Sequence, residues 1–274
     1  MRAAKIAIFL RISTRFAQKA RLIIFVSDMD ITPVAHIRSP FPEKFGIPRQ
    51  SRLARDCTAT VEFTPGFRSP DAVRGLDSFS HIWLIWGFSE ARWDGAFTVR
   101  PPRLGGNTRI GVFASRSPYR PNGIGMSAVR LLRVEMTPDR GPLLHVAGAD
   151  LLDGTPIYDI KPYIPYADCI GEACDGYTGP TKDHRISVEF APGVTDALED
   201  NGEKPVRDGQ DTAGPRDGRD KLLEQIRQLL ELDPRVSYDS DPGKVWGMCY
   251  GPYNIRFTVA EGVARVIEIS AVRN

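Results

Sequence analysis

The sequence predicts a mainly β protein, with a β-barrel or β-sandwich domain followed by a small α+β domain. Short apolar runs separated by Gly, Pro and Asn recur from residue 33 to residue 190, which is typical of antiparallel strands. One later segment has apolar residues at helical spacing. The chain has no Gly-x-Gly-x-x-Gly motif and no regular alternation of strands and helices, so a Rossmann fold is not expected.

The expected elements follow from these patterns in chain order. Strands of the larger domain are expected at residues 59–63, 82–86, 110–114, 128–134 and 143–152. A helix is expected over residues 221–232, where Leu and Ile recur at positions 222, 223, 226, 229 and 230 before Asp233-Pro234 ends the run. Residues 245–272 alternate apolar and polar side chains, which indicates a hairpin or a small sheet.

The chain therefore divides into four parts. Residues 1–30 are an extension, 31–190 the barrel domain, 191–220 a flexible insert rich in Asp, Glu, Gly and Pro, and 221–274 the small domain. The extension is rich in Arg and has no acidic residue before Asp28. Three interpretations stay open for it: a disordered extension, translation that begins at Met29, or a targeting segment.

Composition excludes several classes of protein. Four cysteines (Cys57, Cys169, Cys174 and Cys249) are too few for a disulfide framework, and they are expected to be reduced thiols in a cytoplasmic protein. No apolar run is long enough to span a membrane, so a soluble protein is expected. The four histidines (His36, His81, His145 and His184) are scattered singly, so no metal site is expected.

Residues 95–134 carry many arginines and no acidic residue. The arginines are Arg100, Arg103, Arg109, Arg116, Arg120, Arg130 and Arg133. A solvated face would explain such a run, but the interspersed Pro and Gly make a regular exposed helix a poor explanation. A phosphate or carboxylate ligand is the other interpretation.

Three segments have compositions suited to ligand binding. Residues 100–107 (RPPRLGGN) combine a stiff backbone with glycines that let the main chain approach a ligand. Residues 114–126 place two arginines, a tyrosine and two glycines together, which suits carboxylate binding and ring stacking. Residues 150–163 hold an Asp-Gly turn with acidic groups that could bind ribose hydroxyls or a cation. Together the segments meet the needs of an S-adenosylmethionine site.

These motifs resemble, in order and spacing, the TrmO family, also called TsaA-like or YaeB-like. The resemblance rests on RPPRLGGN, SRSPYRPNGIGMS and DGTP-x-x-DIKPY, on the earlier segments at residues 36–40, 48–50, 71–76 and 79–83, and on Asp233-Pro234-Arg235. It implies a closed antiparallel barrel with a small C-terminal domain, a homodimer, and S-adenosylmethionine-dependent N6-methylation of N6-threonylcarbamoyladenosine at tRNA position 37.

The resemblance also implies site residues, carried over by matching motif. The implied cofactor-binding residues are Pro48, Arg49, Gln50, Ser89, Glu90, Arg116, Met126, Asp153, Gly154, Thr155 and Pro156. Relatives often hold histidine where this chain has Ser89. The polar insert before Lys221 is a second departure from the family pattern.

The chemistry of the acceptor suggests further roles. A carbonyl substituent makes the acceptor nitrogen a poor nucleophile with an acidic N–H, so a base is useful. Asp159 or Tyr163 is expected to be that base, with Lys161 lowering the local pKa. The expected substrate-binding residues, which would contact the substrate carboxylate or the anticodon loop, are Arg100, Arg103, Arg120, Asn122, Asp233, Arg235, Asn254 and Arg256.

Two other functions remain open at this stage. The chain could be a non-catalytic module that binds RNA or senses S-adenosylmethionine, in which the arginines bind phosphates. It could also be a methyltransferase with another acceptor, because one fold serves several substrates. A helix stop is an equally good interpretation of Asp233-Pro234-Arg235.

Overall fold

The computed structural model describes residues 30–104, 107–181, 184–195, 198, 218–235, 241 and 243–272. Residues from Thr32 onward form one compact unit. The predicted N-terminal extension and most of the predicted insert at 191–220 lie outside the described residues, so those two predictions have no structural counterpart.

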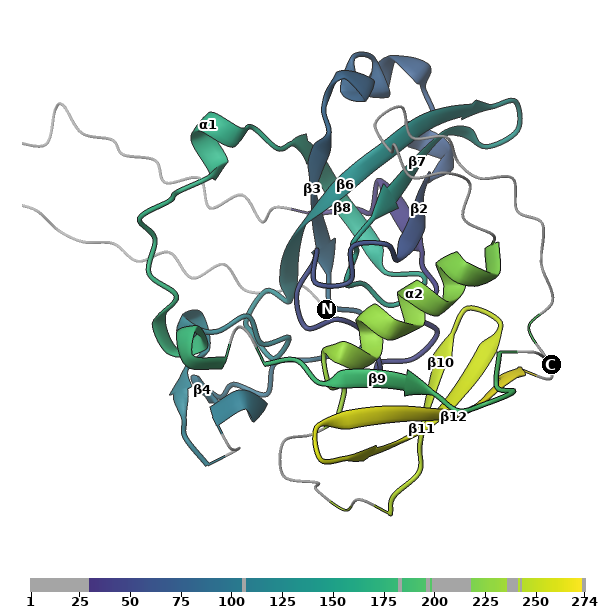
Figure 1. The fold of residues 1–274 in the computed structure, drawn as a ribbon. Coiled ribbons are helices and arrows are strands. Elements are labelled where there is room, and N and C mark those ends of the chain that lie inside the picture. The colour runs from purple at the N-terminus through teal and green to yellow at the C-terminus, as the bar shows by residue number, and fades with distance from the viewer. Residues whose placement is uncertain are drawn as a thin grey trace, which may run out of the picture. The chain divides into compact units, whose positions relative to one another are not determined.

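The larger part of the fold is a closed six-stranded barrel in the order β1-β2-β7-β6-β3-β8 (Figure 1). Its strands are β1 (Ala35–Arg38), β2 (Thr58–Phe63), β3 (His81–Gly87), β6 (Ile124–Thr137), β7 (Gly141–Ala147) and β8 (Pro156–Pro162). Each pairing is antiparallel, and β8 closes the ring by pairing Ile157 with Ala35 of β1. The predicted mainly β fold with a closed barrel is confirmed.

Alternating side chains build the barrel core. Along β3, Ile82, Leu84 and Trp86 are at most 8% exposed, whereas the residues between them are half-buried. This period of two is what a strand requires when one face is buried and the other meets solvent. Val61 and Val146 of the neighbouring strands complete the same apolar cluster.

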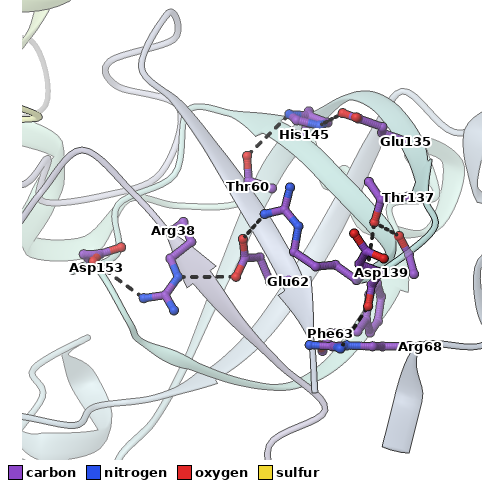
Figure 2. Close-up of polar contacts among 12 residues, drawn as sticks. Arg38, Thr60, Glu62, Phe63, Arg68, Glu135, Thr137, Asp139, His145 and Asp153 are labelled. Atoms are coloured by element: carbon purple, nitrogen blue, oxygen red, sulfur yellow. Dashed lines mark hydrogen bonds and ion pairs between the residues drawn. The ribbon is translucent and has the colours of Figure 1, made fainter. Parts of the chain in front are cut away.

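The outer face of β1, β2, β6 and β7 is polar (Figure 2). Glu62 accepts hydrogen bonds from Arg38 at 3.4 Å and Arg140 at 3.0 Å. His145 and Glu135 lie 2.7 Å apart on the next two strands. Because these groups are half-exposed ion pairs, they add solubility more than stability.

A second, four-stranded sheet has the order β10-β11-β12-β9. Its strands are β9 (Ser187–Phe190), β10 (Trp246–Tyr250), β11 (Tyr253–Ala260) and β12 (Val263–Ala271), and helix α2 (Gly218–Glu231) lies across it (Figure 1). Ile226, Leu229 and Leu230 of α2 are buried against the sheet. This arrangement confirms the predicted small α+β domain.

Short elements connect the strands. They are β4 (Thr98–Val99), β5 (Ile110–Gly111), α1 (Pro165–Asp168) and six 3₁₀ turns: Pro65–Phe67, Pro70–Val73, Leu76–Ser78, Pro102–Leu104, Val112–Ala114 and Gly176–Thr181. Between β11 and β12, Glu261 and Gly262 have φ of 48° and 75°, the conformation of a tight hairpin turn. No helix among the described residues is long and apolar enough to cross a membrane.

Three predicted elements differ in the structure. The strand predicted at 110–114 ends at Gly111 and continues as a 3₁₀ turn, and the strand predicted at 143–152 ends at Ala147. The apolar runs continue past those strand ends because Val112, Ala149 and Leu151 are buried in loops. Ser187–Phe190, predicted within the barrel domain, pairs with β12 in the second sheet. Local periodicity does not identify a strand's partner.

Candidate functional site

A cavity of about 470 Å³ lies at one end of the barrel. Trp86 and Phe88 line it from the end of β3, and Gly125 and Met126 line it from the start of β6. The rings of Trp86 and Phe88 lie edge to face with centroids 4.4 Å apart. A Cβ on Gly125 would lie 2.5 Å from the Trp86 ring, so that glycine lets the indole lie against the backbone. This volume and these aromatic walls suit a small organic ligand.

A chain of three hydrogen-bonded residues ends in this cavity. Trp86 Nε1 donates to Ser127 Oγ at 3.0 Å, and Ser127 Oγ donates to Asp150 Oδ1 at 2.6 Å. Trp86 and Ser127 are 8% and 1% exposed. Burial raises the pKa of the Asp150 carboxyl to about 6, although the Ser127 hydroxyl and the nearby Arg116 oppose that increase. A poorly hydrated carboxylate therefore faces the cavity.

Basic side chains surround the rest of the cavity. Arg116 donates a short hydrogen bond to the Gln50 amide oxygen, and Arg120 donates to the Ser115 carbonyl at 3.0 Å. Lys44 lies 3.9 Å from the Glu90 carboxylate. Because Arg116 and Arg120 are both tethered, the cavity presents oriented guanidinium groups to an anionic ligand.

Most of the predicted cofactor-binding residues meet at this cavity. Those that line it are Pro48, Arg49, Gln50, Ser89, Glu90, Arg116, Met126 and Thr155. They come from the loop after β1, the end of β3, the loop before β6, β6 itself and the loop before β8. Segments far apart in the sequence therefore supply one site, although their role in cofactor binding stays a prediction.

The remaining predicted cofactor residues, Asp153, Gly154 and Pro156, are not among the described lining residues. The Asp153 carboxylate accepts from the Ser39 backbone N–H at 3.0 Å. It also lies 3.9 Å from Arg38, and this ion pair is drawn in Figure 2. Gly154 has φ of +76° and donates its N–H to the Ile37 carbonyl. The Asp-Gly turn thus joins β1 to the loop before β8.

The predicted catalytic residues lie along and just beyond β8. Lys161 and Asp159 form an ion pair of 2.7 Å, with side chains 63% and 50% exposed. Tyr163 contacts Trp83, with ring centroids 5.5 Å apart. None of the three is among the described cavity-lining residues. In the barrel register Asp159 of β8 pairs with Ile85 of β3, and Ile85 pairs with the cavity residue Met126 of β6. Asp159 therefore lies two strands from Met126, on the same face of the barrel wall.

The predicted substrate-binding residues are distributed over several regions. Arg120 lines the cavity. Arg100 and Asn122 are exposed on the loops before β6, and the side chain of Arg103 lies outside the described part of the structure. Asn254 and Arg256 lie on β11, where Arg256 pairs with Glu268 at 2.9 Å.

Asp233 and Arg235 form a tight pair instead of presenting open charges. Arg235 donates to both Asp233 carboxylate oxygens at 2.8 and 2.9 Å, and both side chains are at most 16% exposed. Arg49 donates to the backbone carbonyls of both residues at 3.3 and 3.0 Å. A second cavity of about 380 Å³, lined by Arg49 and Pro234, lies beside this contact. Arg49 therefore links the cofactor-sized cavity to the segment that follows α2.

Sequence reasoning missed Asp150 and Ser127 as site residues. Asp150 stands in the third ligand-suited segment, but its composition does not separate Asp150 from Asp153. Ser127 ends the SRSPYRPNGIGMS motif and looks like an ordinary strand residue. A weak signal is that Ser127 is polar at an inward-facing position of β6, between the apolar Gly125 and Val129.

Cysteine and metal chemistry receive no support from the described residues. Cys57 is buried beside Tyr250, and burial raises the pKa of its thiol to about 12, so it is a poor nucleophile. The four cysteines are free thiols. No cluster of three His, Cys, Asp or Glu side chains suited to a metal ion occurs in the described ranges.

Comparison with known proteins agrees with this geometry. Residues 36–169 match the tRNA-methyltransferase O N-terminal domain, and residues 209–272 match the TrmO C-terminal domain. The chain is 37% identical over 240 residues to the tRNA (adenine(37)-N6)-methyltransferase of Escherichia coli, covering 86% of this chain and 95% of that protein. It is 40% identical over 220 residues to a Pseudomonas aeruginosa protein, RcsF, provisionally named as an S-adenosylmethionine-dependent methyltransferase, covering 80% and 87%.

Solved structures agree in both sequence and fold. A crystal structure of TrmO superposes with a TM-score of 0.69 at 34% identity, covering 89% of this chain and 99% of that one. The crystal structure of TrmO from Pseudomonas aeruginosa gives 0.68 at the same identity and covers the same shares. Both domains match in order, and the relatives are matched over nearly their whole length. The chain therefore belongs to the tRNA-methyltransferase O family.

Proposed function

We propose that this protein is an S-adenosylmethionine-dependent methyltransferase that methylates N6 of the adenine at position 37 of tRNA. The acceptor we propose is N6-threonylcarbamoyladenosine. The observation that carries the proposal is the cavity at the barrel end, where the residues matched to the family motifs meet around Asp150 and Arg116. Two relatives that this chain matches over 95% and 99% of their length are named tRNA (adenine(37)-N6)-methyltransferases.

The residues of the cavity fit the chemical groups of S-adenosylmethionine. Trp86, Phe88 and Tyr119 offer aromatic surface for the adenine ring, and Arg116 offers a guanidinium group for the carboxylate. Asp150 offers a buried acceptor. A volume of about 470 Å³ falls in the range of small-molecule sites. Apolar walls, cations and one buried acid together match a ligand that carries both charges.

Alignment is the main task of the protein in this reaction. When bound, S-adenosylmethionine supplies a methyl group on a positively charged sulfur, and its transfer to nitrogen needs no covalent link to the protein. Apolar side chains such as Phe88 and Met126 exclude water from the cavity, and tethered arginines hold the anionic groups of both ligands in place. Water exclusion strengthens each of these charged contacts.

The acceptor nitrogen must lose a proton during methylation. Its carbamoyl substituent makes the N–H more acidic, and a nearby acceptor assists proton removal. We keep Asp159 as the proposed base, with Lys161 2.7 Å away to stabilise its carboxylate form. Tyr163 is the alternative. The position of Asp159 on the same barrel face as Met126 supports access to a substrate that covers both.

We further propose that the anticodon loop contacts basic residues of both parts of the chain. Arg100, Arg120 and Arg256 are candidates for phosphate or carboxylate contacts, and Arg103, Asn122 and Asn254 are neighbouring candidates. The buried Asp233–Arg235 pair is better suited to shaping the loop after α2. We place this reaction in the cytoplasm, which fractionation of cells that produce the tagged protein would test.

We also propose a homodimer. Three large apolar side chains that line the cavity are exposed, Tyr119 by 53%, Met126 by 50% and Ile124 by 38%, and Phe113, in the 3₁₀ turn before them, is 77% exposed. Exposed apolar side chains grouped beside a ligand site commonly mark an interaction surface. Sedimentation velocity of the full chain is expected to give twice the 30.4 kDa monomer mass, and a monomer at all concentrations tested would contradict the dimer.

The decisive test of function is methyl transfer from labelled S-adenosylmethionine to two tRNA preparations, with and without the threonylcarbamoyl group. We expect N6-methylation confined to the modified tRNA, identified by the mass of the released nucleoside. Asp159→Asn is expected to lower the rate without weakening cofactor binding. Equal methylation of both preparations would favour another acceptor, and RNA binding without any transfer would favour a non-catalytic module.

A further inference from the structure

Asp150 is the less exposed of the two acids among the described residues that line the cavity. The other lining acid, Glu90, has a side chain 60% exposed and lies near Lys44. Asp150 follows β7 in a loop whose neighbours Ala149 and Leu151 are at most 2% exposed. A half-buried carboxylate between such neighbours loses part of its hydration, and this loss costs free energy unless a cation or hydrogen-bond donors replace the water.

The hydrogen bonds around Asp150 have a defined direction. The Trp86 indole can only donate, so Ser127 Oγ accepts that bond and must use its own proton toward Asp150 Oδ1. Asp150 Oδ1 is therefore an acceptor. Because Trp86 and Ser127 are buried in the barrel end, they hold the carboxylate in one orientation before any ligand binds.

A guanidinium group stands beside this carboxylate. Arg116 lies close enough to favour the ionised form of Asp150, and it is itself held by Gln50. The cavity thus presents an oriented anion and an oriented cation side by side. An α-amino acid carries an ammonium and a carboxylate close together, so each of its charges can face the opposite charge of the site.

Other groups of the cofactor fit Asp150 less well. Ribose hydroxyls would donate hydrogen bonds but would add no positive charge beside the carboxylate, whose nearby cation, Arg116, is the group that we assign to the ligand carboxylate. A sulfonium carries positive charge but has no N–H or O–H to donate. An ammonium supplies both the charge and three donors.

Resting on the cofactor proposed above, we infer that Asp150, held by Ser127 and Trp86, binds the α-ammonium group of the methionine moiety, while Arg116 binds its α-carboxylate. Asp150 then determines which sulfur-linked nucleosides enter the site. Thioethers that lack the amino group bind more weakly because the ligand then brings no cation to the Asp150 carboxylate.

Calorimetric titration of the full chain with three ligands tests this inference. The ligands are S-adenosylhomocysteine, its deaminated analogue and its decarboxylated analogue. Asp150→Asn is expected to weaken S-adenosylhomocysteine about 10- to 100-fold, the range of one hydrogen bond to a charged group. It should weaken the decarboxylated analogue by a similar factor and change the deaminated one less than about threefold. Arg116→Ala should show the opposite selectivity.

The possible outcomes distinguish a failure of the role given to Asp150 from a failure of the cofactor assignment. Equal losses for all three ligands on Asp150→Asn, with wild-type binding intact, would overturn the role of Asp150 alone. A loss much larger for S-adenosylmethionine than for S-adenosylhomocysteine would assign Asp150 to the sulfonium and also overturn it. Failure of the wild-type protein to bind S-adenosylhomocysteine would overturn the cofactor assignment as well. Ser127→Ala, which keeps the carboxylate but releases its orientation, should give a smaller loss with the same selectivity.

Discussion

Phe41→Ala is expected to lower the free energy of unfolding by about 3–5 kcal/mol, the usual cost of removing a buried phenylalanine ring. Phe41 is 1% exposed and belongs to the loop that follows β1. Its ring nevertheless packs in the second core, edge to face with Tyr250 at a centroid distance of 5.7 Å. Its carbonyl also accepts the Asp153 N–H at 2.8 Å. The substitution therefore leaves a cavity where the barrel loop meets the second sheet.

Urea denaturation followed by circular dichroism measures this loss. Phe67→Ala, at a position 43% exposed, is the matched control and should change the free energy of unfolding by less than about 1 kcal/mol. Phe41→Leu should recover part of the loss, because leucine fills some of the ring volume. A Phe41→Ala variant as stable as the control would show that the loop after β1 does not contribute to the second core.

Asp150→Asn is expected to stabilise the protein more at pH 7.5 than at pH 4.5. Burial raises the folded-state pKa of Asp150 from its ordinary value of 3.8 to about 6. The folded state therefore holds this proton more tightly, and the resulting stability is present below about pH 4 and lost as pH rises through about 6. The ionised carboxylate costs about 3 kcal/mol at neutral pH, since one pH unit corresponds to about 1.4 kcal/mol.

An asparagine at this position accepts the Ser127 hydrogen bond without carrying a charge. The difference in unfolding free energy between Asp150→Asn and the wild-type protein should therefore be about 2 kcal/mol larger at pH 7.5 than at pH 4.5. Urea titrations of both proteins at several pH values measure it. Asp77→Asn, at an exposed position, controls for the loss of one negative charge. The same difference at every pH would show that Asp150 is not destabilised by burial.

The second prediction describes a site residue that lowers the stability of the folded protein at neutral pH. The carboxylate is retained in a half-buried position although a neutral residue would make the folded protein more stable. This is common where a group must meet a charged ligand. A bound cation would offset the cost, so ligand binding and folding stability are linked at Asp150.

Much of the architecture was predictable from the sequence because it depends on local patterns. The short apolar run at 82–86 identified β3, and helical spacing identified α2 within one residue at its C-terminal end and three at its N-terminal end. Long motifs identified the family, and most of the predicted cofactor-binding residues taken from those motifs line one cavity. These features are local because side-chain period and motif spacing are properties of short segments.

Only the tertiary structure decided which segments meet. Closure of the barrel depends on β1 pairing with β8, more than a hundred residues away, and β9 joins β12 in parallel across α2. Apolar alternation identifies the buried face of a strand but not its partner. At the site, too, the sequence does not show which residues Asp150 and Asp153 contact. Asp153, next to the left-handed Gly154, contacts Ser39 and Arg38, whereas Asp150 lines the cavity and accepts a hydrogen bond from Ser127 of β6.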